Sequence, residues 1–195
     1  MKAKFSLPAV KRSVGDVAIP ADDLPVDTEF AVLVALFEED GETRVVLTRR
    51  AAHLRRNRGE VAFPGGRIEP GENAGQAALR EAEEEVALDP GAVDLAGTLQ
   101  ALQTVSRTGF IQPVVGFIAG RPELVANPDE VAEVFDVALS DLAAPGAMRQ
   151  EMWALPDGSE RAIFFFDVCD PPVWGATARI LKDLLEVVGG DPSPK

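Results

Sequence analysis

The chain has 195 residues but only one cysteine, Cys169, and one histidine, His53. A single cysteine excludes an internal disulfide and is typical of a reducing compartment, so we expect a cytoplasmic protein in which Cys169 is a small buried residue. A single histidine excludes a metal site built from histidines, and a Ser-His-acid triad would depend on it alone. No serine lies in a nucleophile-elbow sequence, so a serine-hydrolase site is not expected either.

Long apolar runs and positive charge are also scarce. The longest apolar run, residues 30–37, is far shorter than the roughly 20 residues of a membrane-spanning helix. The basic N-terminus is not followed by the apolar core of a secretory signal. Nineteen Lys and Arg against 32 Asp and Glu give a net charge of −13, which opposes binding to a phosphate backbone. We therefore expect neither a membrane nor a nucleic-acid partner.

The composition is that of a folded domain, with 46% hydrophobic residues. Residues 1–28 contain three prolines and little periodicity, which predicts an extended lead-in segment. Residues 29–190 are predicted to form a single domain.

Strands and helices alternate irregularly along the predicted domain. The clearest unit is a β-hairpin, with strands over 30–38 and 43–48 joined by an Asp-Gly turn. Helices are expected over 74–86, 139–144 and 174–188, the first capped by Asn73. The expected further strands are 61–63, 93–103, 111–119, 133–139, 151–155 and 162–168. This order favours an α/β (α+β) fold with a mixed sheet.

Charge is strongly segregated within one part of the chain. Five of the nineteen positive charges fall within residues 49–58, in the sequence RRAAHLRRNR just before Phe-Pro-Gly-Gly. Downstream, residues 69–85 contain six glutamates. A cationic segment beside a carboxylate cluster indicates a partner that carries charges of both signs.

The expected helix over 74–86 gathers three of these glutamates. At about 100° per residue, Glu81, Glu84 and Glu85 lie on one side, and Glu83 points away. Like charges at i and i+4 cost an isolated helix roughly 0.2–0.5 kcal/mol, and a divalent cation would remove that cost. A solvated acidic helix face would produce the same pattern, so the surrounding sequence has to decide.

The surrounding sequence resembles a known motif, the Nudix box. The matching positions are Gly66, five residues, Glu72, seven residues, Arg80-Glu81, Ala82, any residue, Glu84-Glu85, any residue, Ala87 and Leu88. The pattern departs at position 87, where the family usually has glycine. The resemblance implies a mixed sheet between helices and hydrolysis of a nucleoside diphosphate linked to another group.

The same resemblance implies roles for individual residues. Glu81, Glu84, Glu85 and the Gly66 carbonyl would bind Mg²⁺ or Mn²⁺, while Glu72 and Arg80 would brace the loop. It also leads us to expect a homodimer. Glu130, in the sequence NPDEV, lies where relatives carry a loop carboxylate, which implies an auxiliary ligand or a general base.

The segment upstream of the box resembles a narrower group, the Nudix coenzyme A pyrophosphatases. Their pattern is matched by Leu47-Thr48, Arg50-Ala51, Arg55, Gly59 and Phe63-Pro64-Gly65-Gly66, and only Val46 differs. The implied substrate is coenzyme A or a derivative, cleaved to 3′,5′-ADP and a 4′-phosphopantetheine species. The residues implied to contact it are Arg50, Arg55, Gly59, Phe63, Gly65 and Gly66.

Two other functions fit the same residues. One is hydrolysis of another diphosphate, such as ADP-ribose or a dinucleotide. The other is a non-catalytic module that senses nucleotides, although such a module has no need of the three helix glutamates.

Overall fold

The computed structural model describes residues 5–17, 28–103, 109–155 and 158–189. The α-helices are α1 (Leu7–Val17), α2 (Ala74–Val86), α3 (Leu139–Leu142) and α4 (Gly175–Val187), with a 3₁₀ turn at Pro90–Ala92. The first strands are β1 (Thr28–Glu39), β2 (Glu42–Arg50), β3 (Val61–Ala62), β4 (Gly65–Arg67), β5 (Val93–Thr98) and β6 (Leu102–Gln103). They are followed by β7 (Phe110–Ile118), β8 (Val131–Ala138), β9 (Met148–Ala154), β10 (Glu160–Phe166) and β11 (Val173–Trp174).

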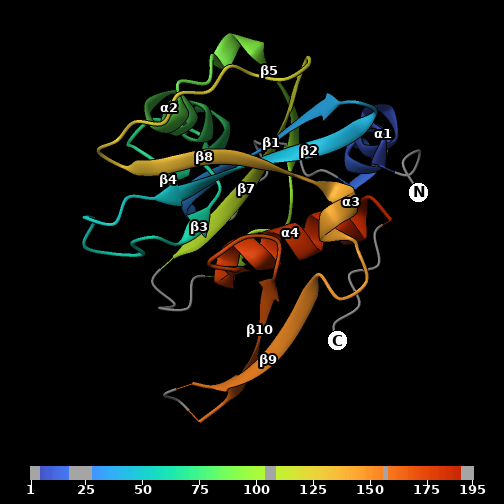
Figure 1. The fold of residues 1–195 in the computed structure, drawn as a ribbon. Coiled ribbons are helices and arrows are strands. Elements are labelled where there is room, and N and C mark those ends of the chain that lie inside the picture. The colour runs from blue at the N-terminus through green and yellow to red at the C-terminus, as the bar shows by residue number, and fades with distance from the viewer. Residues whose placement is uncertain (1–4, 18–27, 104–108, 156–157, 190–195) are drawn as a thin grey trace.

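The described strands form two sheets (Figure 1). The larger runs in the order β3-β2-β1-β7-β5, with β8 paired to β2, β4 to β1 and β6 to β7. It is mixed, because β1 and β7 are parallel whereas the other pairs are antiparallel. The smaller sheet, β11-β10-β9, is antiparallel. The predicted mixed-sheet α/β fold is confirmed.

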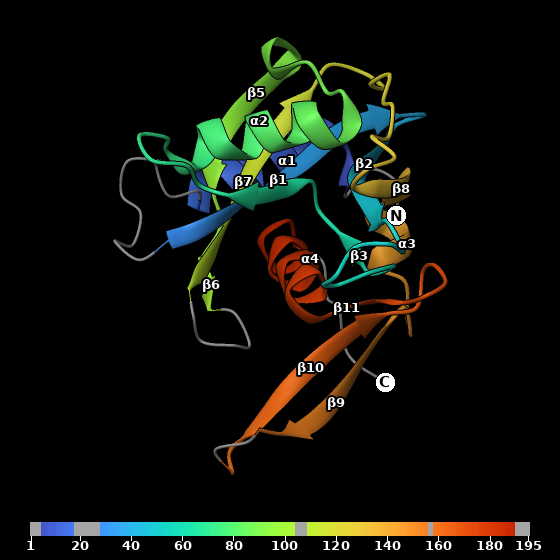
Figure 2. The same cartoon turned by 90° about the vertical axis from the view of Figure 1, so that its left-hand side faces the viewer.

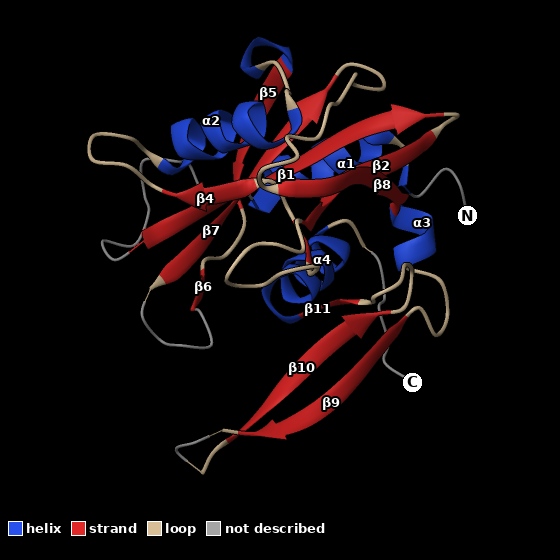
Figure 3. Cartoon of the chain, turned by 60° about the vertical axis from the view of Figure 1, so that its left-hand side comes forward, coloured by secondary structure: helices blue, strands red, loops and turns tan. Residues whose placement is uncertain are grey.

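Helices cover both faces of the large sheet. Figure 3 shows α2 on one side and α4 on the other, with the β9–β10 hairpin beyond α4. Figure 2 gives the same layers from another side and places α1 behind the sheet. Side chains of β1 alternate between a core under α2 and a larger core against α1 and α4. A strand buried on both faces needs an almost continuous apolar sequence, which residues 30–37 provide.

The predicted hairpin and its turn are confirmed. Strands β1 and β2 pair from Leu36–Val45 to Glu39–Glu42. The two turn residues, Asp40 and Gly41, have φ values of 53° and 76°. Positive φ at both central residues is the geometry that the right-handed twist of the strands favours.

The predicted lead-in is wrong for residues 7–17, which form α1. Pro8 lies in the first turn, where the missing N–H of proline breaks no intrahelical hydrogen bond. Val10 and Val14, one turn apart, are fully buried in the larger core. The Leu7 N–H donates to Glu38 Oε2 at 3.0 Å. Burial against the sheet therefore stabilises a helix whose short sequence does not predict it.

Two strands differ from the predicted pattern. No strand was predicted over residues 65–67, but they form β4 and pair antiparallel with residues 30–32 of β1. The single strand predicted over 93–103 is divided into β5 and β6. The β5 register shifts between Leu95 and Gly97, where Gly97 has a φ of 136°. Within the described ranges, no helix is long and apolar enough to cross a bilayer.

Helix α2 follows its prediction closely at both ends. Asn73 caps the N-terminus, and Gln76 completes a capping box with it. At the C-terminus Ala87 adopts the left-handed conformation, with φ 55° and ψ 31°, and its N–H donates to the Ala82 and Glu83 carbonyls. A residue with a side chain is strained in this conformation, which glycine adopts without strain.

We expect Ala87→Gly to raise the free energy of unfolding by roughly 0.5–1 kcal/mol, because glycine removes the left-handed strain. Chemical denaturation measures the change. Ala176→Gly, in the right-handed backbone of α4, is the control and should lower stability by a similar amount. Equal destabilisation by both substitutions would contradict the prediction.

Candidate active site

The predicted carboxylate cluster lies on the face of α2 that meets β4. Glu85 is only 2% exposed and Glu81 is half-buried, whereas Glu84 extends toward solvent. Glu83 is exposed on the other side, as its helical angle predicts. Alanines at 74, 77, 78 and 82 are buried under the helix, so its backbone approaches the sheet closely.

Two glycines of β4 contact these carboxylates directly. The Gly65 N–H donates to Glu85 Oε2 at 3.1 Å. A Cβ atom at Gly66 would lie 2.3–2.6 Å from the carboxylate atoms of Glu81. A Cβ atom at Gly65 would lie 2.4 Å from the Ala31 carbonyl oxygen. Gly65 requires glycine because its backbone is packed against the backbone of β1, whereas a side chain at Gly66 would displace the Glu81 carboxylate.

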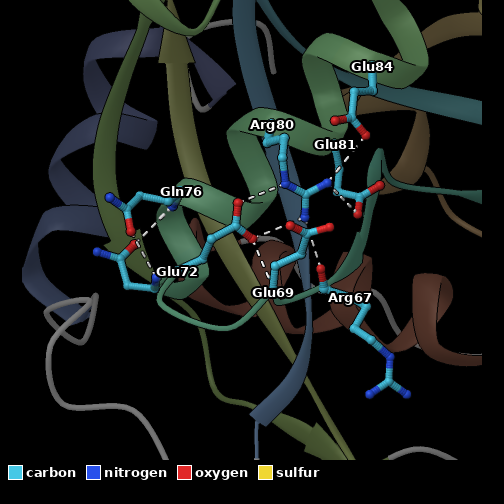
Figure 4. A network of polar contacts seen from close by, with 8 residues as sticks. Arg67, Glu69, Glu72, Gln76, Arg80, Glu81 and Glu84 are labelled. Atoms are coloured by element: carbon cyan, nitrogen blue, oxygen red, sulfur yellow. Dashed lines mark hydrogen bonds and ion pairs between the residues drawn. The ribbon is translucent and has the colours of Figure 1, made fainter.

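Arg80 joins the box helix to the loop that precedes it (Figure 4). Its Nε and Nη2 donate to Glu72 at 2.8 and 3.1 Å, and Nη2 also donates to the Arg67 carbonyl at 3.0 Å. Its Nη1 donates to Glu81 at 3.0 Å and to Glu84 at 3.3 Å. The bracing role that the resemblance implies for Glu72 and Arg80 agrees with these contacts.

Arg50, at the end of β2, lies on the other side of Glu85. Its Nη1 is 3.6 Å from Glu85 Oε1, and its buried Nε has no hydrogen-bond partner within the described residues. Burial raises the pKa of the neighbouring Glu60, which the charge of Arg50 partly offsets. Sequence reasoning missed Glu60, which precedes β3 and has no position in either motif.

The remaining arginines lie on the exposed loop between β2 and β3, the arginine loop (residues 51–60). Its ends are held together by the Gly59 N–H, which donates to the Arg50 carbonyl at 3.0 Å. Gly59 has a φ of 73°, so glycine is favoured there. Arg55 is exposed and forms no ion pair with the described residues. Its guanidinium is therefore available to an anionic ligand.

Glu130 reaches the same region from the loop before β8. Its carbonyl accepts from the Ala51 N–H at 2.8 Å, which places it next to the arginine loop. The negative charge of Glu130 contributes to raising the pKa of both Glu81 and Glu85. The structure therefore brings Glu130 within electrostatic range of the helix carboxylates, from which it is separated by 45 residues or more.

Two carboxyl groups of this site, those of Glu81 and Glu85, have raised pKa values. Burial raises the pKa of Glu85 to about 7, with Glu81 and Glu130 adding to the rise. The Gly65 N–H and Arg50 act in the opposite direction. The pKa of Glu81 is also raised, first by burial, although Arg80 opposes it. A cation bound among these carboxylates would lower the pKa of both.

The donor chemistry of this site fits a hard divalent cation. Carboxylate and carbonyl oxygens are the ligands that Mg²⁺ and Mn²⁺ prefer. In the described part of the chain, however, no three His, Cys, Asp or Glu side chains are already grouped to hold a metal ion. Glu81 and Glu84 are instead turned toward Arg80. Holding a cation would require them to turn away from that guanidinium.

Phe63 and Cys169 differ from their predictions, whereas His53 lies on the loop where it was expected. Phe63 was predicted to contact substrate, but its side chain is 3% exposed and packs in the larger core. Cys169 is half-exposed, not buried, and its thiol donates to the Pro171 carbonyl at 3.2 Å. His53 lies on the exposed loop, where its Nε2 is 3.0 Å from the Asp129 carbonyl oxygen.

Comparison with known proteins gives a consistent result. The family model described as the NUDIX domain matches residues 27–156. Over 168 residues the chain is 39% identical to an uncharacterised Nudix hydrolase, NudL, of Cronobacter sakazakii, and the alignment covers 83% of each protein. It is 38% identical over 123 residues to Nudix hydrolase 3 of Caenorhabditis elegans, which covers 62% of this chain and 51% of that protein.

The fold has a solved counterpart. A Nudix hydrolase of M. smegmatis, RenU, superimposes with a TM-score of 0.61 at 21% identity, covering 87% of this chain and 90% of that one. The chain spans about half the length of the C. elegans relative and 55% of Nudix hydrolase 15 of Arabidopsis thaliana.

Proposed function

The chain belongs to the Nudix hydrolase family, and from that premise we propose that it hydrolyses the diphosphate bond of coenzyme A and its derivatives with Mg²⁺ or Mn²⁺. The expected products are 3′,5′-ADP and a 4′-phosphopantetheine species. We assign this activity to one domain over residues 29–190, onto which α1 packs. The observation that carries the proposal is the convergence of α2, β4 and the Glu130 loop beside the arginine loop.

The proposed roles follow from where each group lies. Glu81, Glu84, Glu85 and the Gly66 carbonyl would hold the cation, with Glu72 and Arg80 bracing them. When bound, the cation would neutralise the diphosphate oxygens and lower the pKa of a water molecule. A Glu130 carboxylate oxygen would accept the proton of that water, because Glu130 lies within electrostatic range of Glu81 and Glu85 on a separate loop.

The proposed preference for coenzyme A rests on the arginines upstream of β3. Coenzyme A carries a diphosphate and a 3′-phosphate, so it is strongly anionic. Arg50 lies beside Glu85, where the diphosphate would bind, and Arg55, on the exposed loop, forms no ion pair with any residue that the structure describes. Guanidinium groups bind phosphate through paired, charge-assisted hydrogen bonds, which suits both positions.

A substrate panel tests this proposal. Coenzyme A, 3′-dephospho-coenzyme A and ADP-ribose would each be assayed with Mg²⁺ and Mn²⁺, with products read by mass spectrometry. We expect kcat/KM to be highest for coenzyme A. Equal turnover of all three would favour a general diphosphate hydrolase, and turnover of none would favour a nucleotide-sensing module.

Arg55→Gln should lower kcat/KM for coenzyme A by about 10–100-fold, because a hydrogen bond to a charged group contributes about 1.5–3 kcal/mol. The rate with 3′-dephospho-coenzyme A should change little if Arg55 binds the 3′-phosphate. Arg56→Gln, on the same exposed loop but outside the signature, is the matched control. Equal losses for both variants would indicate general attraction by the loop charge instead.

A further inference from the structure

A segment distant in sequence closes the C-terminal end of α2. The last four carbonyls of an α-helix have no intrahelical partner. Here the Glu83 carbonyl accepts from the Ala87 N–H at 3.0 Å. The next three carbonyls all accept from residues 125–127: Glu84 from Asn127 Nδ2 at 3.2 Å, Glu85 from the Asn127 N–H at 2.9 Å and Val86 from the Val125 N–H at 2.9 Å.

Asn127 also organises the loop that leads to Glu130. Its Oδ1 accepts from the Asp129 N–H at 3.1 Å. Its carbonyl accepts from the Glu130 and Val131 N–H groups at 3.0 and 2.8 Å. One residue therefore connects the backbone of the carboxylate helix with the backbone of Glu130.

The far side of this loop is held by the arginine loop. The Glu130 carbonyl accepts from the Ala51 N–H at 2.8 Å, and His53 Nε2 lies 3.0 Å from the Asp129 carbonyl oxygen. Hydrogen bonds therefore hold the Glu130 loop from two sides, at Asn127 and at the arginine loop. Of these two attachments, only the one through Asn127 reaches the helix that carries Glu81 and Glu85.

We propose that Asn127 is a positioning residue for the hydrolysis, because it fixes the Glu130 carboxylate relative to Glu81 and Glu85. This inference rests on the proposed function. Sequence reasoning missed Asn127, although an Asn-Pro pair is a turn signal and could have marked it.

The side chain at position 127 has to donate and accept at the same time. The amide Nδ2 donates to the helix and Oδ1 accepts from the loop, a combination that asparagine provides. Ionised aspartate has the same shape but no donor, and it would place a negative charge at the negative end of the helix dipole. Asn127→Asp is therefore a nearly isosteric variant that breaks the side-chain bond to the Glu84 carbonyl of the helix and keeps the side-chain bond to the loop.

A double-mutant cycle tests the proposal. Asn127→Asp and Asn127→Ala would be measured in the native chain and together with Glu130→Gln. We expect each Asn127 substitution to lower kcat by about 10-fold or more with a small change in KM, and to lower it no further when Glu130 is already glutamine. Additive losses would overturn the proposal, as would unchanged kcat in both Asn127 variants or wild-type activity of Glu130→Gln.

The matched control is Asn73→Ala, which removes the capping box at the opposite end of the same helix. It should destabilise α2 comparably but change kcat by less than about twofold. A loss of kcat in Asn73→Ala equal to that in the Asn127 variants would overturn the proposal, because helix stability alone would then explain both.

Hydrogen exchange gives a readout that does not depend on activity. In the native chain the Glu130, Val131 and Ala51 amides should be protected, and Asn127→Asp should increase their exchange at least about tenfold while the α2 interior stays protected. Unchanged exchange would overturn the proposal. If the native chain cleaves no diphosphate, the proposed function fails, whereas the exchange pattern still shows whether Asn127 fixes the loop.

Discussion

Glu85→Gln is expected to lower kcat for the preferred diphosphate by at least about 100-fold while the protein folds normally. Glu85 is the most buried of the three helix carboxylates, and it is held between the Gly65 N–H and Arg50. Glutamine keeps an oxygen for the Gly65 N–H but removes the negative charge that would bind a cation. Removing such a group usually costs two orders of magnitude or more.

The control for this experiment is Glu83→Gln. Glu83 lies on the same helix but is exposed on its opposite side, so kcat should be unchanged. A second measurement is the thermal midpoint with and without Mn²⁺, because an ion that binds only the folded state raises it. The shift should be present in the native chain and in Glu83→Gln, and much smaller in Glu85→Gln. Full activity of Glu85→Gln would remove the proposed mechanism.

The same substitution should increase stability in the presence of a chelator. The pKa of Glu85 is raised by burial to about 7, from an ordinary value near 4.5, so the folded state holds the proton more tightly than the unfolded chain. Stability of the native chain is therefore lost as pH rises between these two values. Glutamine carries no charge, so Glu85→Gln should be more stable by roughly 1–3 kcal/mol at pH 8, with the difference gone below about pH 4.5. Denaturation curves in EDTA at the two pH values test this.

Gly66→Ala is expected to lower kcat by about 100-fold with less than about 1 kcal/mol of lost stability. The new methyl group would lie 2.3–2.6 Å from the carboxylate of Glu81. That carboxylate is the end of a flexible side chain, so it can move away without disturbing the fold. A displacement of about 1 Å in a group that orients the reaction can cost about 100-fold in rate.

Gly65→Ala should give the opposite balance, with roughly 3 kcal/mol or more of lost stability. Its methyl group would lie 2.4 Å from the Ala31 carbonyl oxygen and 2.6 Å from Val32 Cα, and backbone atoms cannot move aside as a side chain can. Gly15→Ala, where no atom lies within 4 Å, is the control and should leave kcat unchanged. Thermal denaturation and kcat measured together separate the two glycines. Wild-type kcat in Gly66→Ala would show that the position of Glu81 is not critical.

Local sequence patterns predicted those elements whose cause is local. The hairpin at Asp40-Gly41 and helix α2 with its Asn73 cap depend on residues within a few positions of one another. The box motif also led us to expect that Arg80 and Glu72 brace the loop, and the two side chains form an ion pair. Such features depend on turn chemistry and helical periodicity, which can be read along a single stretch of chain.

Other features were missed because their cause lies elsewhere in the chain. Helix α1 is stabilised by the core that it covers, and β4 exists because β1 provides an edge to pair with. Phe63 follows the signature pattern, yet its side chain is buried in the larger core, to which the sheet and α4 contribute. No local pattern contains this information, because burial depends on what packs against a residue.

The sequence by itself determined the family, the mixed-sheet fold and the helix that carries Glu81, Glu84 and Glu85, because motif spacing and periodicity are properties of one continuous segment. Only the tertiary structure decided that Glu85 is buried against Gly65 and Arg50, and that Asn127 attaches the Glu130 loop to α2. These contacts join residues 20 to 43 positions apart. Their electrostatic effects depend on distance in space and on burial, which the order of residues does not specify.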